Sequence, residues 1–120
     1  MDNRDMIDDY NDAWNRQDLD AVAAMHDNDI VFHNWTAGDR VEGADAVRAH
    51  IGGIFERYPT LRFTGRSMRV GDDFVVSEWT ARTTSDGETR EWDGIDVFPI
   101  VNGKIVRKDV YSSSHAPRVL

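Results

Sequence analysis

A chain of 120 residues without cysteine is long enough for one domain that folds without disulfide bonds, and too short for two. Its formal net charge of −8 opposes binding to nucleic acid and to anionic membranes, because both carry negative charge. The acidic N-terminus is unlike a signal peptide, and no apolar run approaches membrane-spanning length. We therefore expect a single domain, residues 1–120, that works in the cytoplasm.

The first half of the chain carries the pattern of three helices and one short strand. Apolar residues recur at helical spacing over 3–16, so Tyr10 and Trp14 are expected to face a core. Asp18 fits the N-cap of a second helix over 19–25. A strand is predicted over 30–35, then an irregular connection over 36–43. A third helix is predicted over 44–58, ended by Pro59.

The second half predicts an antiparallel meander. Strands are expected over 61–70 and 73–84, followed by a hairpin within 91–114 whose turn lies at Asn102-Gly103. A two-residue turn would place Asp96 directly opposite Asp109, which is unfavourable because like charges repel across a strand pair. A three-residue loop with a bulge would instead place Asp96 opposite Lys108. This bulged register is the one we predict.

The predicted register gives the hairpin two different faces. One face is mostly apolar with one acid and one base, and consists of Trp92, Gly94, Asp96 and Phe98 beside Val106, Lys108 and Val110. The other mixes charged and apolar groups, and consists of Asp93, Ile95, Val97, Arg107, Asp109 and Tyr111. Nothing remains in the chain to cover this second face, so we expect a homodimer. Helices followed by an antiparallel sheet indicate an α+β domain whose helices cover one sheet face.

Five segments carry a pattern that is found together in one superfamily. They are 17–21 (QDLDA), 30–34 (IVFHN), 43–48 (GADAVR), 92–98 (WDGIDVF) and 102–105 (NGKI). In these segments the chain resembles the nuclear-transport-factor-2-like superfamily, and within it the SnoaL-like and ketosteroid-isomerase-like branch. The resemblance implies a cone-shaped fold in which three N-terminal helices pack on a curved antiparallel sheet. Members include isomerases, polyketide cyclases, epoxide hydrolases and non-catalytic binding proteins, so the fold alone does not fix the reaction.

The resemblance also implies roles for individual residues. Tyr10 matches the tyrosine that hydrogen-bonds the developing oxyanion in ketosteroid isomerase, and Asp96 matches the acid that shares this task. The proton-shuttling aspartate of that enzyme falls at Asn34, and an amide cannot take a proton. In cyclases and epoxide hydrolases the catalytic acid tends to lie on the last strand, at a position that corresponds to about Val110 in this chain. A valine side chain is inert in acid–base chemistry. If Lys108 pairs with Asp96, the carboxyl is ionised and becomes a possible base itself.

The other candidate residues are judged by their chemistry. His33 has the best case among the histidines as a general base, although a lone histidine is more often packed and neutral. The histidines and acids show no metal-binding spacing, so neither metal nor cofactor is expected. A pocket for a small hydrophobic, ring-bearing ligand is predicted. Its lining is Trp14, Asn34, His50, Ile54, Tyr58, Trp79, Trp92, Phe98 and Val110.

Two classes of function remain open. The first is a cofactor-free isomerase or cyclase that acts on a small hydrophobic or polycyclic carbonyl compound. Its candidate catalytic residues are Asp96, Tyr10, Lys108 and His33. The second is a non-catalytic binding domain of the same fold, which the amide at Asn34 favours; an epoxide hydrolase is a third option that Val110 argues against. A titratable group and a hydrogen-bond donor that converge on one cavity would distinguish an enzyme from a binding domain.

Overall fold

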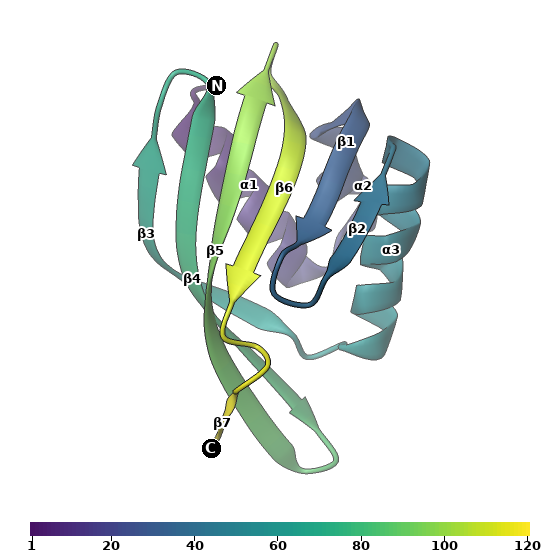
Figure 1. Cartoon of the computed structure of the whole chain (residues 1–120), viewed down its shortest axis with the longest axis vertical. Helices are drawn as coiled ribbons and strands as arrows, with labels where there is room; N and C mark the ends of the chain where they lie inside the picture. The colour runs from purple at the N-terminus through teal and green to yellow at the C-terminus, as the bar shows by residue number, and fades with distance from the viewer.

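The computed structural model describes residues 1–120 as three helices and one seven-stranded sheet. The helices are α1 (Asn3–Arg16), α2 (Leu19–Ala24) and α3 (Ala44–Arg57). The strands are β1 (His26–Asn34), β2 (Asp39–Glu42), β3 (Arg62–Val70), β4 (Phe74–Ser85), β5 (Glu88–Val101), β6 (Lys104–Ser112) and β7 (Arg118–Val119). The sheet is curved and the helices lie against one of its faces (Figure 1). The predicted α+β class is confirmed.

The strand order in the sheet is β2-β1-β6-β5-β4-β3, and β7 pairs with β5. Strands β3 to β6 form the predicted antiparallel meander. Strand β1 joins this meander in parallel to β6 and pairs antiparallel with β2. The long β4–β5 hairpin extends beyond the helices, and β7 pairs with its β5 arm, so the C-terminal segment returns along this extension (Figure 1).

The helices begin and end close to the predicted positions. Asp2 caps α1, its side chain accepting a hydrogen bond of 2.8 Å from the backbone N–H of Asp5. Asp18 caps α2 in the same way, as the sequence predicts. Tyr10 and Trp14 both face the core. None of the helices is long and apolar enough to cross a membrane.

The strands before α3 differ from the prediction. Strand β1 begins at His26, four residues before the predicted start. The prediction began too late because residues 27–29 are polar and give no alternating apolar signal, although their backbone is already extended in the strand. Strand β2 occupies part of the predicted irregular connection. It was missed because Val41 is its only apolar residue, and one such residue carries no periodicity.

The predicted hairpin register is wrong. Asn102 and Gly103 form a two-residue turn with φ of 51° and 73°, the conformation that Asn-Gly favours. The bulge lies farther along, between Val97 and Ile100, and places Asp96 opposite Val110 instead of Lys108. Pro99 lies in this irregular stretch, where its missing N–H cannot contribute to the ladder.

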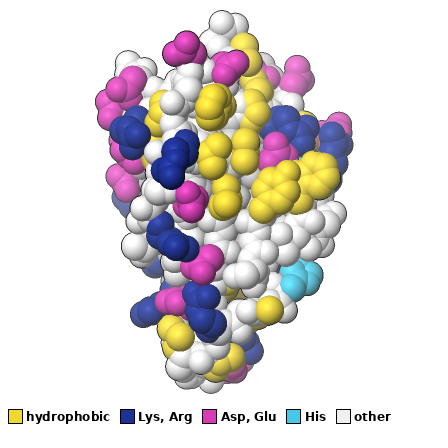
Figure 2. All heavy atoms as spheres, turned by 60° about the vertical axis from the view of Figure 1, so that its left-hand side comes forward, with side chains coloured by type: hydrophobic (Ala, Val, Ile, Leu, Met, Phe, Trp, Pro, Cys, Tyr) yellow, Lys and Arg dark blue, Asp and Glu magenta, His cyan; other side chains and the backbone are white.

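The register also decides which residues of β6 face the helices. Ile105 is fully buried in place of the predicted Val106, which is only partly buried. Lys108 and Val110 both face inward as expected. The outer face exposes Ile95 and Tyr111, which are direct partners across β5 and β6. Figure 2 shows hydrophobic side chains gathered on one surface with charged groups around them.

Gly94 makes room for an aromatic wall. A Cβ atom at this position would lie 2.1 Å from the indole ring of Trp79, the residue opposite it on β4. No side chain larger than hydrogen can be placed there without moving the ring. The glycine therefore lets the Trp79 ring lie directly against the backbone of β5.

Candidate functional site

A buried ion pair lies on the inner face of the sheet. The Nζ atom of Lys108 on β6 is 3.3 Å from Oδ2 of Asp96 on β5. Only 6% of Lys108 and 4% of Asp96 is exposed, whereas the other ion pairs of the chain lie at or near the surface. The two residues are diagonal neighbours on one face of the hairpin. The prediction that they interact is therefore met, although by a different register.

Aromatic rings surround the Lys108 ammonium group. Its Nζ atom is 4.5 Å from the ring centroid of Trp14 and 5.0 Å from those of Tyr10 and Phe98. Ring faces attract cations, so this cage stabilises the charged amine where water cannot. The cage has no further acceptor for the amine, and Asp96 supplies its single hydrogen bond within the protein.

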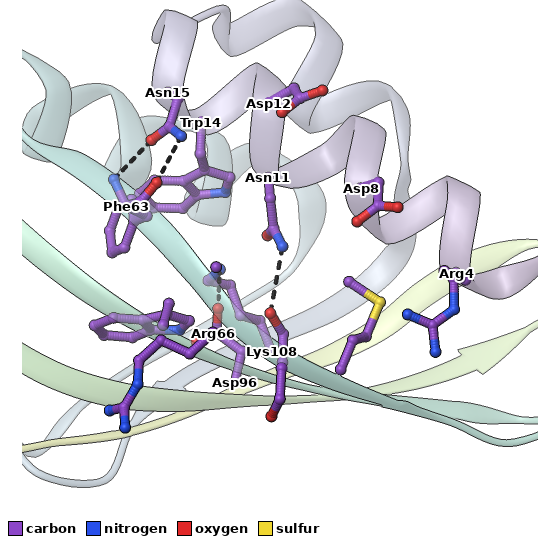
Figure 3. A pocket seen from close by; sticks show the side chains of 15 residues that line it. Arg4, Asp8, Asn11, Asp12, Trp14, Asn15, Phe63, Arg66, Asp96 and Lys108 are labelled. Atoms are coloured by element: carbon purple, nitrogen blue, oxygen red, sulfur yellow. Dashed lines mark hydrogen bonds and ion pairs between the residues drawn. The ribbon is translucent and has the colours of Figure 1, made fainter.

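The pair lies between two cavities. One, of about 440 Å³, is lined by α3, the inner sheet face and the C-terminal segment, and we call it the α3 cavity. The other, of about 370 Å³, is lined by α1, β3 and β4, and we call it the α1 cavity (Figure 3). Both cavities share five lining residues, which are Trp14, Phe63, Trp79, Asp96 and Lys108. A molecule in either cavity can reach the ion pair.

The α3 cavity brings together most of the predicted pocket residues. Its lining includes Trp14, Asn34, His50, Ile54, Tyr58, Trp79, Trp92 and Val110. Phe98 does not line it, because this residue is fully buried and packs edge-on against Tyr10 with ring centroids 5.5 Å apart. Thr83, Arg90 and His115 line the cavity without having been predicted. They belong to the β4–β5 extension and the C-terminal segment, whose return to this place depends on long-range pairing.

The α1 cavity was not predicted from the sequence. Besides the ion pair, charged residues of two elements line it: Arg4, Asp8 and Asp12 of α1, and Arg66 of β3 (Figure 3). Asn15 ties α1 to β3, since its side chain donates to the Phe63 carbonyl oxygen and accepts from the Phe63 N–H, each at 2.8 Å. These polar residues gave the sequence pattern of a solvated helix face, and that pattern does not reveal a cavity beneath it.

Burial shifts the pKa values of the ion pair toward each other. Burial raises the pKa of Asp96 above its usual range, and the nearby Lys108 charge opposes this only in part. Burial likewise lowers the pKa of Lys108, against the effect of Asp96. The Lys108 charge does lower the pKa of the acid, but desolvation is the larger effect. A proton can move between the two groups more easily than between the same groups in water.

Three further polar atoms near the pair make no hydrogen bond within the protein. They are Oδ1 of Asp96 and the indole nitrogens Nε1 of Trp14 and Trp79, all buried. Buried polar atoms are nearly always hydrogen-bonded in folded proteins, and an exception calls for an explanation such as strain, a bound water or a catalytic role. All three residues line both cavities. The site thus combines an apolar wall with one unpaired acceptor and two unpaired donors. No three His, Asp or Glu side chains converge where they could hold a metal ion.

Tyr10 does not line either cavity. Its hydroxyl is hydrogen-bonded to Nε2 of His26 at 2.8 Å, and the residue is fully buried. Burial raises the pKa of Tyr10. The hydroxyl is therefore engaged in the core, and only the face of the ring is turned to the Lys108 ammonium group.

His33 also lies away from the ion pair. Its ring stacks on Trp35 with centroids 3.7 Å apart, and it lines neither cavity. The neighbouring Asn34 does line the α3 cavity, as strand alternation requires when one of two adjacent side chains enters a pocket. Of the four predicted catalytic residues, only Asp96 and Lys108 line the cavities, while Tyr10 contributes its ring to the cage around Lys108.

Comparison with known proteins places the chain in a family. Residues 7–108 match the model of the SnoaL-like domain. The chain belongs to the SnoaL-like domain family. This family lies in the nuclear-transport-factor-2-like superfamily that the sequence resembles, and similar solved structures share the fold. No curated protein sequence matches the chain.

Three solved structures illustrate the shared fold. A protein from Jannaschia sp. CCS1, proposed to be a SnoaL-like polyketide cyclase, has a TM-score of 0.85 at 18% identity over 95% of this chain and 87% of its own. TerC, co-crystallised with polyporic acid, has a TM-score of 0.84 at 17% identity over 95% and 93%. An NTF2-like protein of unknown function from Burkholderia pseudomallei K96243 has a TM-score of 0.84 at 20% identity over 94% and 92%. At these identities the likeness shows the fold.

Asn34 occupies a structural turn in this SnoaL-like domain. Its Oδ1 atom accepts hydrogen bonds from the backbone N–H groups of Thr36 at 3.1 Å and Ala37 at 2.9 Å, which shape the connection between β1 and β2. A carboxylate at this position would accept the same two bonds. Because those bonds favour the charged form, they would lower its pKa and weaken it as a base.

We therefore expect Asn34→Asp to fold normally and to gain no isomerase activity toward a β,γ-unsaturated ketone. The Tyr10 hydroxyl, which such a site would need, is bound to His26. The absorbance of the conjugated product measures the gain. An increase of about 100-fold or more, the lower range for a positioned general base, would contradict this expectation.

His26 predicts how the stability of the domain depends on pH. Burial, with a smaller effect of the Lys108 charge, lowers the pKa of His26 to about 4. Between pH 6.5 and 4 the unfolded chain therefore binds a proton that the folded chain does not, so acid destabilises the fold over this window. We expect His26→Gln, whose amide can still accept from Tyr10, to lose this contribution.

The measurement is urea unfolding of both proteins at pH 7, 5.5 and 4. The difference in unfolding free energy, wild type minus His26→Gln, should fall with decreasing pH by up to about 1.4 kcal/mol per unit. Groups common to both proteins cancel in this difference. A difference that stays constant would mean that the pKa of His26 is the same in the folded and the unfolded chain.

Proposed function

We propose that this SnoaL-like domain catalyses proton transfer next to the carbonyl group of a small, hydrophobic, ring-bearing compound bound in the α3 cavity. The observation that carries the proposal is the buried Asp96–Lys108 pair at the boundary of two cavities with aromatic walls. A titratable acid and a hydrogen-bond donor converge there on one space. A domain that only binds a ligand has no need of such convergence.

The pair supplies both parts of an acid–base reaction. The Lys108 ammonium group donates a hydrogen bond to the carbonyl oxygen and stabilises the negative charge that develops on it. The Asp96 carboxylate takes the proton from the adjacent carbon. Because burial raises its pKa, it is a stronger base than an exposed aspartate. Return of the proton to another carbon gives isomerisation, whereas attack of the enolate carbon on an electrophile in the same molecule gives cyclisation.

The shape of the α3 cavity supports a ring-bearing ligand. Trp14, Trp79 and Trp92 provide flat apolar surfaces around the pair. Among relatives of the same fold, one is proposed to be a polyketide cyclase and another was co-crystallised with polyporic acid. These relatives support a small organic molecule as the ligand.

One observation favours a non-catalytic binding domain instead. Asn34 replaces the aspartate that ketosteroid isomerase uses as its base, and its side chain is held by the β1–β2 turn. In that case the ion pair and its aromatic cage only keep the cavity open. An epoxide hydrolase finds no support, because the inert Val110 lines the α3 cavity where such enzymes tend to carry an acid.

The test is deuterium exchange at the α-carbons of 2-tetralone in D₂O, followed by NMR with the rate in buffer subtracted. Quenching of tryptophan fluorescence measures binding of the same ketone in parallel. We expect wild-type protein to bind the ketone and to accelerate exchange. Binding without acceleration would contradict the acid–base proposal and support the binding domain.

We also propose that the domain forms a homodimer through the outer sheet face. Ile95 and Tyr111 are partly exposed opposite each other, and Trp35 stacks parallel to Tyr111 with centroids 6.0 Å apart. A second copy would bury this apolar surface. Sedimentation at micromolar protein should show a dimer that Tyr111→Glu converts to monomer. A wild-type species of only 13.7 kDa would reject the dimer.

A further inference from the structure

The chain contains only two lysines, and they differ in burial and in hydrogen-bond partner. The sequence contains Lys104 and Lys108, while all its other basic side chains apart from histidine are arginines. Lys104 is exposed and donates to the carbonyl oxygen of Ala24 at 2.8 Å. Lys108 lies buried between the two cavities. An amine can lose its proton and become a nucleophile, whereas a guanidinium group cannot.

The surroundings of Lys108 leave its amine free to react. Its one hydrogen bond goes to Oδ2 of Asp96, and aromatic ring faces occupy other sides. The side chain lines both cavities, so a carbonyl carbon can approach from either. A desolvated lysine in an apolar pocket is the arrangement that activates amines for attack on carbonyl compounds.

We propose that Lys108 is a nucleophile that forms an iminium with a ring-bearing aldehyde or ketone bound in the α3 cavity. This covalent step goes beyond the proton transfer proposed above and uses the same cavity. Lysine contributes the new C–N bond, and Asp96 moves the protons.

The step is balanced within the pair. Transfer of a proton from Nζ to Asp96 first gives a neutral amine and a carboxylic acid. The amine attacks the carbonyl carbon, the C=O π bond breaks, and the nitrogen proton moves to the oxygen to give a carbinolamine. Asp96 then protonates the hydroxyl group, which leaves as water while the C=N⁺ bond forms. The products are an iminium, a carboxylate and one water molecule.

The site suits both the start and the end of this step. Desolvation raises the pKa of Asp96 and lowers that of Lys108, and both shifts favour the neutral pair needed for attack. The iminium again carries one positive charge. It lies where the ammonium group was, beside a carboxylate and against the rings of Trp14, Tyr10 and Phe98.

The test is reductive trapping of wild-type protein with 2-naphthaldehyde and sodium cyanoborohydride at pH 7. Intact mass should increase by one naphthylmethyl group, and peptide mapping should place it on Lys108. Because desolvation lowers the pKa of Lys108, a larger fraction of this amine is neutral at pH 7, so labelling of Lys108 should be several-fold faster than that of Lys104. The rate should saturate with aldehyde concentration.

Matched variants separate the two amines. Lys104→Arg should be labelled like wild type, whereas Lys108→Arg, which keeps the positive charge, should lose the fast label. Label confined to Lys104 or the N-terminal amine, or no label at all, would overturn the inference. Equally fast labelling of Lys108→Arg would overturn it as well.

The inference and the proposed function can fail separately. Exchange of 2-tetralone without trapping at Lys108 would overturn the inference and leave the acid–base reaction intact. Trapping at Lys108 without exchange would support the inference and contradict the acid–base reaction.

Discussion

Lys108→Met is expected to lower the free energy of unfolding by about 3 to 5 kcal/mol at pH 7, the usual cost of leaving one partner of a buried ion pair unpaired. Asp96 would remain buried, with neither a cation nor a hydrogen bond to its Oδ2 atom. The aromatic cage would persist around a neutral side chain. Urea unfolding followed by tryptophan fluorescence measures the loss.

The double variant Asp96→Leu with Lys108→Met should recover this loss. Replacing both charges of a buried pair by apolar groups is often neutral or stabilising by about 1 to 4 kcal/mol, because neither charge then has to leave water. We therefore expect the double variant to match or exceed the wild type in stability. A double variant less stable than Lys108→Met would show that the pair itself holds the fold together.

The pH dependence of the single variant follows from the same cause. Without Lys108 the pKa of Asp96 should rise further, so the folded state keeps a proton that the unfolded chain releases near pH 4. Such a group favours the fold at low pH, and the contribution is lost as pH rises through the folded pKa. The deficit of Lys108→Met against wild type should thus be smaller at pH 4.5 than at pH 7. An equal deficit at both values would mean that removing Lys108 leaves the pKa of Asp96 in the folded protein unchanged.

Asp96→Asn should slow exchange of 2-tetralone by about 10²- to 10⁴-fold, the range typical of losing a positioned general base. Asp109→Asn is the matched control. Asp109 is an acid on the outer face of β6, where it accepts hydrogen bonds from Arg107 and from Nε1 of Trp35 and lines neither cavity. Its loss should leave exchange unchanged. Equal effects of both substitutions would point to a change in the fold and contradict the role of Asp96.

The wild-type rate should also depend on pH in a defined way. Exchange requires the Asp96 carboxylate, and burial raises the pKa of this group. As the pH is lowered, the rate should therefore begin to fall at a pH above the pKa of an ordinary aspartate. Exchange also requires the Lys108 ammonium group, and burial lowers the pKa of this group. As the pH is raised, the rate should therefore fall at a pH below the pKa of an ordinary lysine. Because the two groups interact, the two apparent pKa values read from this pH profile belong to the pair and not to either residue alone.

The sequence predicts the fold and much of the site because their signals are local. Helical spacing places Tyr10 and Trp14 inward, the Asp18 cap starts α2, and the Asn-Gly turn marks the hairpin. The family resemblance identifies Asp96 through its neighbours. Its interaction with Lys108 follows because both lie on the inner face, whichever residue of β6 is the direct partner.

What the sequence does not predict depends on long-range geometry. The bulge at Pro99 changes the register of β5 and β6, and no local pattern separates a bulge there from one at the turn. The partner of the Tyr10 hydroxyl is His26, which joins the sheet only because β1 extends farther than its apolar residues indicate. The contribution of His115 to the α3 cavity requires the C-terminal segment to return along β5.

The most direct test of the account compares exchange of 2-tetralone by wild type and by Asp96→Leu with Lys108→Met. The double variant keeps the aromatic walls of the cavity and is expected to be folded and to bind the ketone, as fluorescence quenching will show. It lacks only the two charged groups. The account predicts that wild type accelerates exchange and that the double variant, although it binds, does not exceed the rate in buffer. Equal acceleration by both proteins would contradict the assignment of Asp96 and Lys108 as the reactive pair.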